Sequence, residues 1–334
     1  MTSYRWRLLR AGAFRLDGGS MFGLIPRAVW SRACPADDRG RIPVQHNCLL
    51  LERASEPPPS APGSPITPIT PSPRLILIEA GTGDKLDAKN RDIFALEDRS
   101  ILTALHEADC RPDDIDLAIV SHLHFDHAGG LTRACRQGES PDWTGPGSAF
   151  AGSGGTRPVK RSFPNARIVA QRREWDDALA NRSVMTRTYF PDHLEPIREQ
   201  MLLVDSIAPF PPGSIVERDA SPPIPQPFRE TEVAPGIFVF RVPGHTWGQQ
   251  AIRFTDTSGR SIVFTPDVLP TAWHLGQAYS LAYDVEPYTS MVSRGWFLAE
   301  AADRNWTLCL DHEPGNPIRT VRRADRWFEL HESA

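Results

Sequence analysis

The sequence predicts an α/β fold in which short buried strands alternate with helices. Two observations favour this class. Short apolar runs bounded by turn residues recur along the chain, as at residues 75–78. The side chains best suited to bind metal each follow the end of such a run. Since 40% of the 334 residues are hydrophobic, the chain can also form a sizeable core.

The expected elements follow one another in a regular order. Residues 75–78 form a strand that ends in a glycine-containing turn, and residues 97–109 carry apolar side chains at helical spacing. A strand over 115–120 leads directly into a histidine-rich segment. The later elements are strands over 167–170, 237–242, 261–265 and 306–310, and a helix over 173–179. Rigid strands would therefore bring distant side chains to one edge of a sheet.

Many of the 32 prolines cluster in three segments, near residues 55–73, 136–162 and 209–230. Proline has no backbone N–H for a regular ladder, so we expect these segments to be surface loops. Motif residues lie on both sides of every segment. The loops are therefore interpreted as insertions into a single domain over residues 1–334, with a linker between two domains as the alternative.

Charge and composition exclude several classes of partner. The net charge is −4 with both signs interspersed, which offers no electrostatic surface for nucleic acid or an anionic membrane. No apolar run reaches the length of a membrane span, and the N-terminus lacks the continuous apolar segment of a secretory signal. Five well-separated cysteines argue against a disulfide framework. We therefore expect a cytoplasmic protein.

Four metal-capable side chains lie together after the second expected strand: His122, His124, Asp126 and His127. Side chains alternate along an extended segment, so His122 and His124 can bind one ion while the following turn directs the other two toward a second. Imidazole and carboxylate ligands suit zinc first, with iron, manganese or cobalt as alternatives. Structural zinc sites are usually rich in cysteine, and none lies here, which favours a catalytic centre.

Three further candidates complete a set of seven: His245, Asp267 and His312. Each follows an expected strand. Seven ligands exceed the four of a tetrahedral zinc ion and suit two ions, between which Asp267 can bridge. The positive charge of two divalent ions exceeds the negative charge of two aspartates and one hydroxide, so the centre keeps a net positive charge. Such a centre can polarise a carbonyl or phosphoryl oxygen and lower the pKa of water to about 7.

These motifs resemble those of the metallo-β-lactamase superfamily. The shared pattern is H-x-H-x-D-H at residues 122–127, Gly-His-Thr at 244–246, and then Asp267 and His312. The resemblance implies an αββα sandwich with two metal ions at one edge. It places His122, His124 and His245 on one ion, and Asp126, His127 and His312 on the other, with Asp267 between them.

Longer segments are similar to the quorum-quenching lactonases, which hydrolyse N-acyl homoserine lactones. They comprise residues 16–23, 121–133, 163–167 and 171–175. Asp267 argues against a true β-lactamase, which usually lacks a bridging aspartate. The sequence departs from the lactonases at Glu79, where Asp is usual, at Pro266, where Gly is usual, and at Trp247, where a smaller residue is common. Trp247 beside His245 would narrow the pocket against long acyl chains.

The expected function is hydrolysis of a lactone or ester bond in a small molecule, by hydroxide formed at the two-metal centre. Asp267 would bridge the ions and Asp126 is a candidate proton shuttle. His274 is a candidate oxyanion donor, with a buried structural histidine as an equal alternative.

Three residues are candidates for substrate binding: Met21, Phe22 and Trp247. Met21 and Phe22, together with Trp30, would line an apolar acyl pocket, although core packing is the commoner role of such residues.

Other functions fit the same ligands. A phosphotriester or aryl-ester hydrolase would use the same centre. A ligand-binding or regulatory protein could retain the metals without turnover, and a zinc-stabilised scaffold is a third alternative. A glyoxalase-like thioesterase is disfavoured because no basic patch for glutathione is evident. The family resemblance alone suggests a homodimer.

Overall fold

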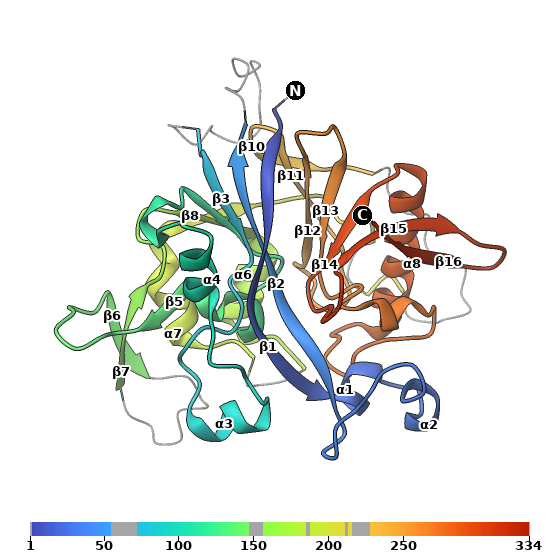
Figure 1. The fold of residues 1–334 in the computed structure, drawn as a ribbon, viewed down its shortest axis with the longest axis horizontal. Coiled ribbons are helices and arrows are strands. Elements are labelled where there is room, and N and C mark those ends of the chain that lie inside the picture. The colour runs from blue at the N-terminus through green and yellow to red at the C-terminus, as the bar shows by residue number, and fades with distance from the viewer. Residues whose placement is uncertain are drawn as a thin grey trace.

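The protein is seen here as a computed structural model that describes residues 2–54, 72–146, 156–184, 188–210, 213–215 and 228–333. Two mixed β-sheets pack face to face, with helices on their outer faces (Figure 1). This arrangement confirms the expected αββα sandwich of the metallo-β-lactamase type. Within the described ranges, no helix is both long and apolar enough to cross a membrane.

The first sheet has six strands in the order β1-β2-β3-β4-β8-β9. Its strands are β1 (Tyr4–Asp17), β2 (Arg41–Arg53), β3 (Leu75–Ile78), β4 (Leu117–Ile119), β8 (Arg167–Gln171) and β9 (Met201–Val204). The long β1–β2 hairpin and the β2–β3 pair are antiparallel, whereas β3, β4, β8 and β9 run parallel to one another. The elements α3 (Ala88–Ile93), α4 (Ile101–Glu107), α6 (Arg172–Leu179) and α7 (Pro191–Leu194) belong to this half of the sandwich.

The second sheet has seven strands in the order of the sequence. Its strands are β10 (Thr231–Ala234), β11 (Ile237–Arg241), β12 (Gln250–Thr255), β13 (Ser261–Thr265), β14 (Thr307–Leu310), β15 (Ile318–Arg323) and β16 (Phe328–Glu332). Only β13 and β14 are parallel, because the long helix α8 (Pro287–Asp303) connects them. Phe297 and Leu298 of this helix pack on the outer face of the sheet.

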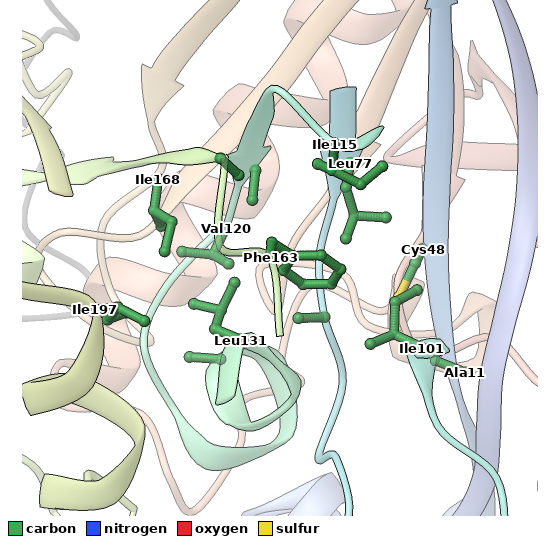
Figure 2. Packing of buried hydrophobic residues seen from close by; sticks show 14 of the residues in the cluster. Ala11, Cys48, Leu77, Ile101, Ile115, Val120, Leu131, Phe163, Ile168 and Ile197 are labelled. Atoms are coloured by element: carbon green, nitrogen blue, oxygen red, sulfur yellow. The ribbon is translucent and has the colours of Figure 1, made fainter. Parts of the chain in front are cut away.

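Side-chain alternation along the strands creates separate cores on the two faces of each sheet. Ile76 and Ile78 of β3 join the core between the sheets, while Leu77 points to the opposite face. There Leu77 shares a core with Ile101 of α4 and Phe163 (Figure 2). The sheets are therefore held by apolar packing on both sides, which gives the strand ends a rigid base.

The short elements connect these layers. They are α1 (Gly18–Phe22), α2 (Arg27–Trp30), α5 (Phe125–Ala128), and the 3-10 turns η1 (Pro112–Asp114), η2 (Gly129–Leu131), η3 (Glu195–Gln200) and η4 (Ala272–Leu275). The strands expected from the apolar runs all occur. The helix expected over 97–109 is shorter, since α4 begins only at Ile101 and ends at Glu107.

The expectation of loops was wrong for part of the second proline-rich segment. Residues 136–162 contribute β6 (Trp143–Pro146) and β7 (Thr156–Arg161), which form a small sheet with β5 (Thr132–Ala134). Pro158 is tolerated in the central strand because proline keeps its carbonyl, which accepts a hydrogen bond from the Cys135 N–H.

The other two proline-rich segments are described only in part. Residues 55–71 and 216–227 lie outside the described residues. In the third segment Phe210 is buried rather than exposed, and its ring meets Trp296 of α8 edge to face. The side chain is thus part of the packing of α8, not of a surface loop.

Candidate metal centre

The seven expected ligands converge at one edge of the sandwich, where strands of both sheets end. The histidine-rich segment follows β4 of the first sheet, while His245, Asp267 and His312 follow β11, β13 and β14 of the second. All seven side chains are buried. The seam between the two sheets is therefore the place where the two sets of ligands meet.

Three imidazoles form the first group: His122, His124 and His245. One ring nitrogen of each lies within 4.8 Å of the others. Nδ1 of His124 is 3.0 Å from Nε2 of His245. Three converging imidazole nitrogens are the ligand set of many catalytic zinc sites.

The second group combines two imidazoles with carboxylates. Nε2 of His127 is 3.2 Å from Nε2 of His312, and Asp126 lies 3.7 Å from the same His312 nitrogen. His127, His312, Asp267 and Asp311 also place their ligand atoms within 4.8 Å of one another. Asp311 was not among the expected ligands, although it directly precedes His312 in the sequence.

Asp267 reaches both groups. Its Oδ2 is 3.1 Å from Nε2 of His245, and its Oδ1 is 3.4 Å from Nε2 of His312. Each carboxylate oxygen thus faces a different group, as the bridging position expected for Asp267 requires.

The unpaired atoms test whether metal ions fit this arrangement. Nε2 of His122, Nε2 of His124 and Oδ1 of Asp267 are buried and have no hydrogen-bond partner among the described residues. Buried polar atoms without partners are costly. Nε2 of His122 lies 4.0 Å from Oδ2 of Asp267, and Oδ1 of Asp267 lies 3.4 Å from Nε2 of His312, so these two atoms face the other ligands, whereas His124 faces them with Nδ1. The donor set fits two divalent ions, with three imidazoles for one and a mixed set for the other.

Protein groups fix the orientation of the histidine rings from behind. Nδ1 faces an oxygen in four of the five rings, the exception being His124: His122 faces Ser121 Oγ at 3.0 Å, His127 faces Glu79 Oε2 at 3.2 Å, His245 faces Asp284 Oδ1 at 2.9 Å, and His312 faces the Gln45 carbonyl at 3.0 Å. Such contacts favour the tautomer that leaves Nε2 free for a metal.

Glu79 combines this role with a strained backbone. Its φ of 68° lies in the left-handed region, which non-glycine residues rarely adopt. Its Oε1 accepts a hydrogen bond of 2.5 Å from the Ser121 N–H, while burial raises the pKa of the carboxyl to about 8. Glu79 therefore ties the turn after β3 to the start of the ligand segment.

The electrostatics of the site keep most ligand imidazoles neutral. Burial, and next the neighbouring rings, lower the pKa values of His122, His124 and His127 well below the usual value. Neutral imidazole is the form that binds metal. Burial also lowers the pKa of His245, but Asp267 and Asp284 outweigh it and raise that pKa to about 9.

A cavity of about 320 Å³ opens onto the centre. Its polar part is formed by ligands from both groups, with the hydroxyl-bearing Tyr283 beside them. Its apolar part includes Leu16, Met21, Ile93, Phe94 and Phe125. The expected contribution of Met21 thus agrees with its position. Tyr283 was missed, because no motif connects it with the ligands.

The structure places His274 outside this cavity's lining. Its Nε2 lies 2.9 Å from the Met21 carbonyl and its Nδ1 lies 2.8 Å from Thr271 Oγ1. Both ring nitrogens are occupied, and burial lowers the pKa of the ring to about 3. The expected oxyanion role does not fit this geometry, so the buried structural histidine is the correct interpretation.

Two substrate-binding expectations also need correction. Phe22 stacks between Trp30 and His274, which makes it part of a core and not of the cavity lining. Trp247 does not line the cavity either. Its ring lies beneath the guanidinium of Arg173, at 4.4 Å from the ring centroid. Because the Trp247 ring packs against Arg173 and does not line the cavity, it does not narrow the pocket beside His245.

Comparison with known proteins agrees with this geometry. The family model described as metallo-beta-lactamase superfamily matches residues 74–312, which is well over half of the chain. The chain belongs to the metallo-β-lactamase superfamily. The matched range begins just before β3 and ends at the ligand His312. The chain therefore combines the superfamily fold with two groups of side chains that could hold metal ions.

Relatives within the superfamily include lactonases. An N-acyl homoserine lactonase of Bacillus thuringiensis is 26% identical over 199 residues. The match covers 59% of this chain and 56% of that protein, so the chain spans just over half the length of the curated relative.

Two solved structures share the superfamily fold along nearly the whole chain. A probable metal-dependent hydrolase from Staphylococcus aureus has a TM-score of 0.69 and 22% identity, and covers 99% of this chain and 98% of its own. AidC, described as a dizinc quorum-quenching lactonase in complex with a product, has a TM-score of 0.66 and 16% identity, with 100% and 98% covered. At 22% and 16% identity, these two similarities show a shared fold and nothing more.

Proposed function

We propose that this protein opens the ring ester of lactones, with N-acyl homoserine lactones as the first candidates. The observation that carries the proposal is the cavity in which an apolar wall meets ligands of both groups. Leu16, Ile93 and Phe94 offer a surface for an acyl chain, and Asp126 and Asp267 lie at the polar end. A substrate with an apolar tail beside an ester would fit this division.

Two divalent ions, zinc being the first candidate, would polarise the ester carbonyl and supply hydroxide at neutral pH. The protein's own residues contribute binding and proton transfer. The apolar wall excludes water from the reacting ester. Asp126 lines the cavity and is placed to carry a proton to the leaving oxygen. Tyr283 lines the same cavity, and its hydroxyl, which interacts with Ser20, is the candidate donor to a carbonyl oxygen of the substrate.

The similarity to the Bacillus lactonase supports this substrate class, within its 26% identity. The test is proton release by the metal-loaded protein on acyl homoserine lactones of several chain lengths, before and after chelation. Chelator-sensitive turnover that improves with chain length is expected. An Asp267→Asn variant should lose metal and turnover together. Turnover that survives complete metal removal would overturn the proposal.

A phosphotriester or aryl-ester hydrolase is the second candidate, favoured by the aromatic residues of the cavity. The rings of Phe94 and Phe125 lie 5.4 Å apart, and Tyr283 lines the same space. An aryl leaving group would find stacking partners there. An aryl ester and an aryl phosphotriester belong in the same assay. A preference for them over every lactone would keep the metal centre and change the substrate class.

A further inference from the structure

Asp311 lies inside the metal centre without a role in the expected ligand set. It follows the last residue of β14 and directly precedes His312. The residue is only 2% exposed. One of its carboxylate oxygens lies within 4.8 Å of the ligand atoms of His127, Asp267 and His312. The side chain is therefore close enough to share an ion with them.

The carboxylate has nothing in the described part of the chain to neutralise it. Neither oxygen has a hydrogen-bond partner there, and the nearby His312 N–H, which lowers the pKa of the carboxyl slightly, donates instead to the Pro270 carbonyl. The described salt bridges include none to Asp311, and the charged side chains that act on it are the acids Asp267, Glu79 and Asp126. A buried carboxylate among other acids needs either a cation or a proton.

The geometry favours the cation. Asp311 is grouped with two imidazole nitrogens that themselves converge, His127 Nε2 and His312 Nε2 being 3.2 Å apart. A site that only stored a proton would not need these nitrogens close by. The ring nitrogen of His312 that faces away from the centre is already held by the Gln45 carbonyl, so its Nε2 is left for an ion.

We propose that Asp311 is a further carboxylate ligand of the second metal position and makes that position richer in oxygen than the first. The first position has three imidazoles: His122, His124 and His245. The second has the imidazoles of His127 and His312 beside the carboxylates of Asp126, Asp267 and Asp311. This inference concerns the metal centre alone and is independent of the substrate proposed above.

Ligand chemistry then distinguishes the two positions. Carboxylates suit hard ions such as Mn²⁺, whereas imidazoles suit zinc. Zinc binds more tightly than manganese at most sites. The two positions are therefore compared by the ratio of their Mn²⁺ affinity to their Zn²⁺ affinity. The second position has the higher affinity for Mn²⁺ relative to Zn²⁺, and Asp311 is one cause of that preference.

Metal titration of the apo protein tests the assignment without any substrate. Mn²⁺ binding is followed by the loss of the free-ion electron paramagnetic resonance signal, and Zn²⁺ binding by competition with a chromophoric chelator. Asp311→Asn keeps the shape of the side chain and removes its charge. We expect this variant to keep one position intact and to lose at least 10-fold in Mn²⁺ affinity at the other, with a smaller loss for Zn²⁺.

A matched control is Asp256→Asn. Asp256 is also a buried aspartate, but it lies in the turn before β13, at the opposite end of that strand from Asp267, and its carboxylate is held by Ser258 and Arg260. This variant should bind both metals as the original protein does. Unchanged Mn²⁺ affinity at both positions in Asp311→Asn would overturn the proposal and identify Asp311 as a neutral, protonated acid. An equal loss in the control would also overturn it.

Discussion

Oδ1 of Asp284 lies 2.9 Å from Nδ1 of His245, so a buried carboxylate holds the ring of a metal-binding histidine from behind. The other oxygen, Oδ2, accepts a hydrogen bond from the Leu281 N–H. Asp284→Asn should lower the affinity for metal by 10- to 100-fold, because the ring loses its orienting charge. Competition with a chromophoric chelator measures this. The exposed Asp205, replaced by Asn, serves as control, and equal affinities in the two variants would contradict the role.

Glu79 supports His127 and the Ser121 backbone at once. Glu79→Ala leaves the buried Ser121 N–H without its acceptor, which should destabilise the fold by about 1–3 kcal/mol. It also releases the ring of His127, so metal content should fall at the second position. Glu79→Gln keeps an acceptor for Ser121 and should retain more stability. Denaturant unfolding with metal analysis separates the two effects, and identical stabilities of the two variants would argue against the hydrogen bond.

Gly130 lies just after the ligand segment, at a point where its backbone touches the backbone of Ala80 in the turn after β3. A Cβ on Gly130 would lie 2.1 Å from the Ala80 carbonyl oxygen, so Gly130→Ala must displace the turn after β3 or the ligand helix. We expect a loss of several kcal/mol in unfolding free energy, typical of overpacking at a rigid contact. Gly138 has a φ of +84° but open space around a Cβ. Gly138→Ala should therefore cost only about 1–2 kcal/mol, and a similar cost for both would refute the steric argument.

Lys85 makes stability depend on pH. Its buried Nζ donates to the Gly129 and Thr132 carbonyls, and burial lowers its pKa to about 8. Between pH 8 and the ordinary lysine value, the unfolded chain holds a proton that the folded protein has released. Stability therefore rises with pH across this window. The two N–H groups of the neutral amine still satisfy both carbonyls.

Comparison with Lys85→Met isolates this effect. The difference in unfolding free energy between the original protein and the variant should grow from pH 7.5 to pH 9.5, because the variant has no proton to release there. Urea unfolding of the metal-loaded proteins at several pH values gives the difference. A constant or shrinking difference would show that Lys85 keeps its charge in the fold.

Tyr283 is expected to act on the substrate and not on the metals. Tyr283→Phe removes only the hydroxyl, which interacts with Ser20 in the protein, and loss of a donor to the substrate typically costs about 10²–10³ in turnover. Metal content should remain unchanged. Turnover and metal analysis on the same preparation check both statements. Loss of metal in this variant would instead make the hydroxyl part of the site's support.

The convergence of the seven candidate ligands could be predicted from the sequence because these residues follow strand ends in order along the chain. His245, Asp267 and His312 each follow an apolar run, and parallel and antiparallel strands alike deliver them to the seam. Asp311 escaped notice because neighbours in a strand ordinarily point to opposite faces. At the end of β14 the chain leaves the strand, and Asp311 joins His312 in one group.

Other elements were missed for reasons of packing. β1 reads as interrupted by Arg5, Arg7 and Arg10, yet these side chains lie on an edge strand whose alternate residues are buried. The helix α8 includes the fully buried Arg294, which donates to the Val268 and Tyr279 carbonyls. A charged residue inside a core cannot be recognised from a hydrophobic pattern, since its partners come from distant loops.

The ligands join two sheets that pack through apolar side chains and through hydrogen bonds such as those from Gln171 to Gln250 and from Asn47 to the Leu310 carbonyl. The histidine-rich segment belongs to the first sheet, and His245, Asp267 and His312 belong to the second. Bound ions are therefore a crosslink between the halves of the sandwich, closed only after both have folded. Free metal then acts as a ligand of the folded state alone, and raises its stability by about 2.7 kcal/mol at one hundred times the dissociation constant. We therefore expect the unfolding free energy of the protein to rise with the concentration of free metal.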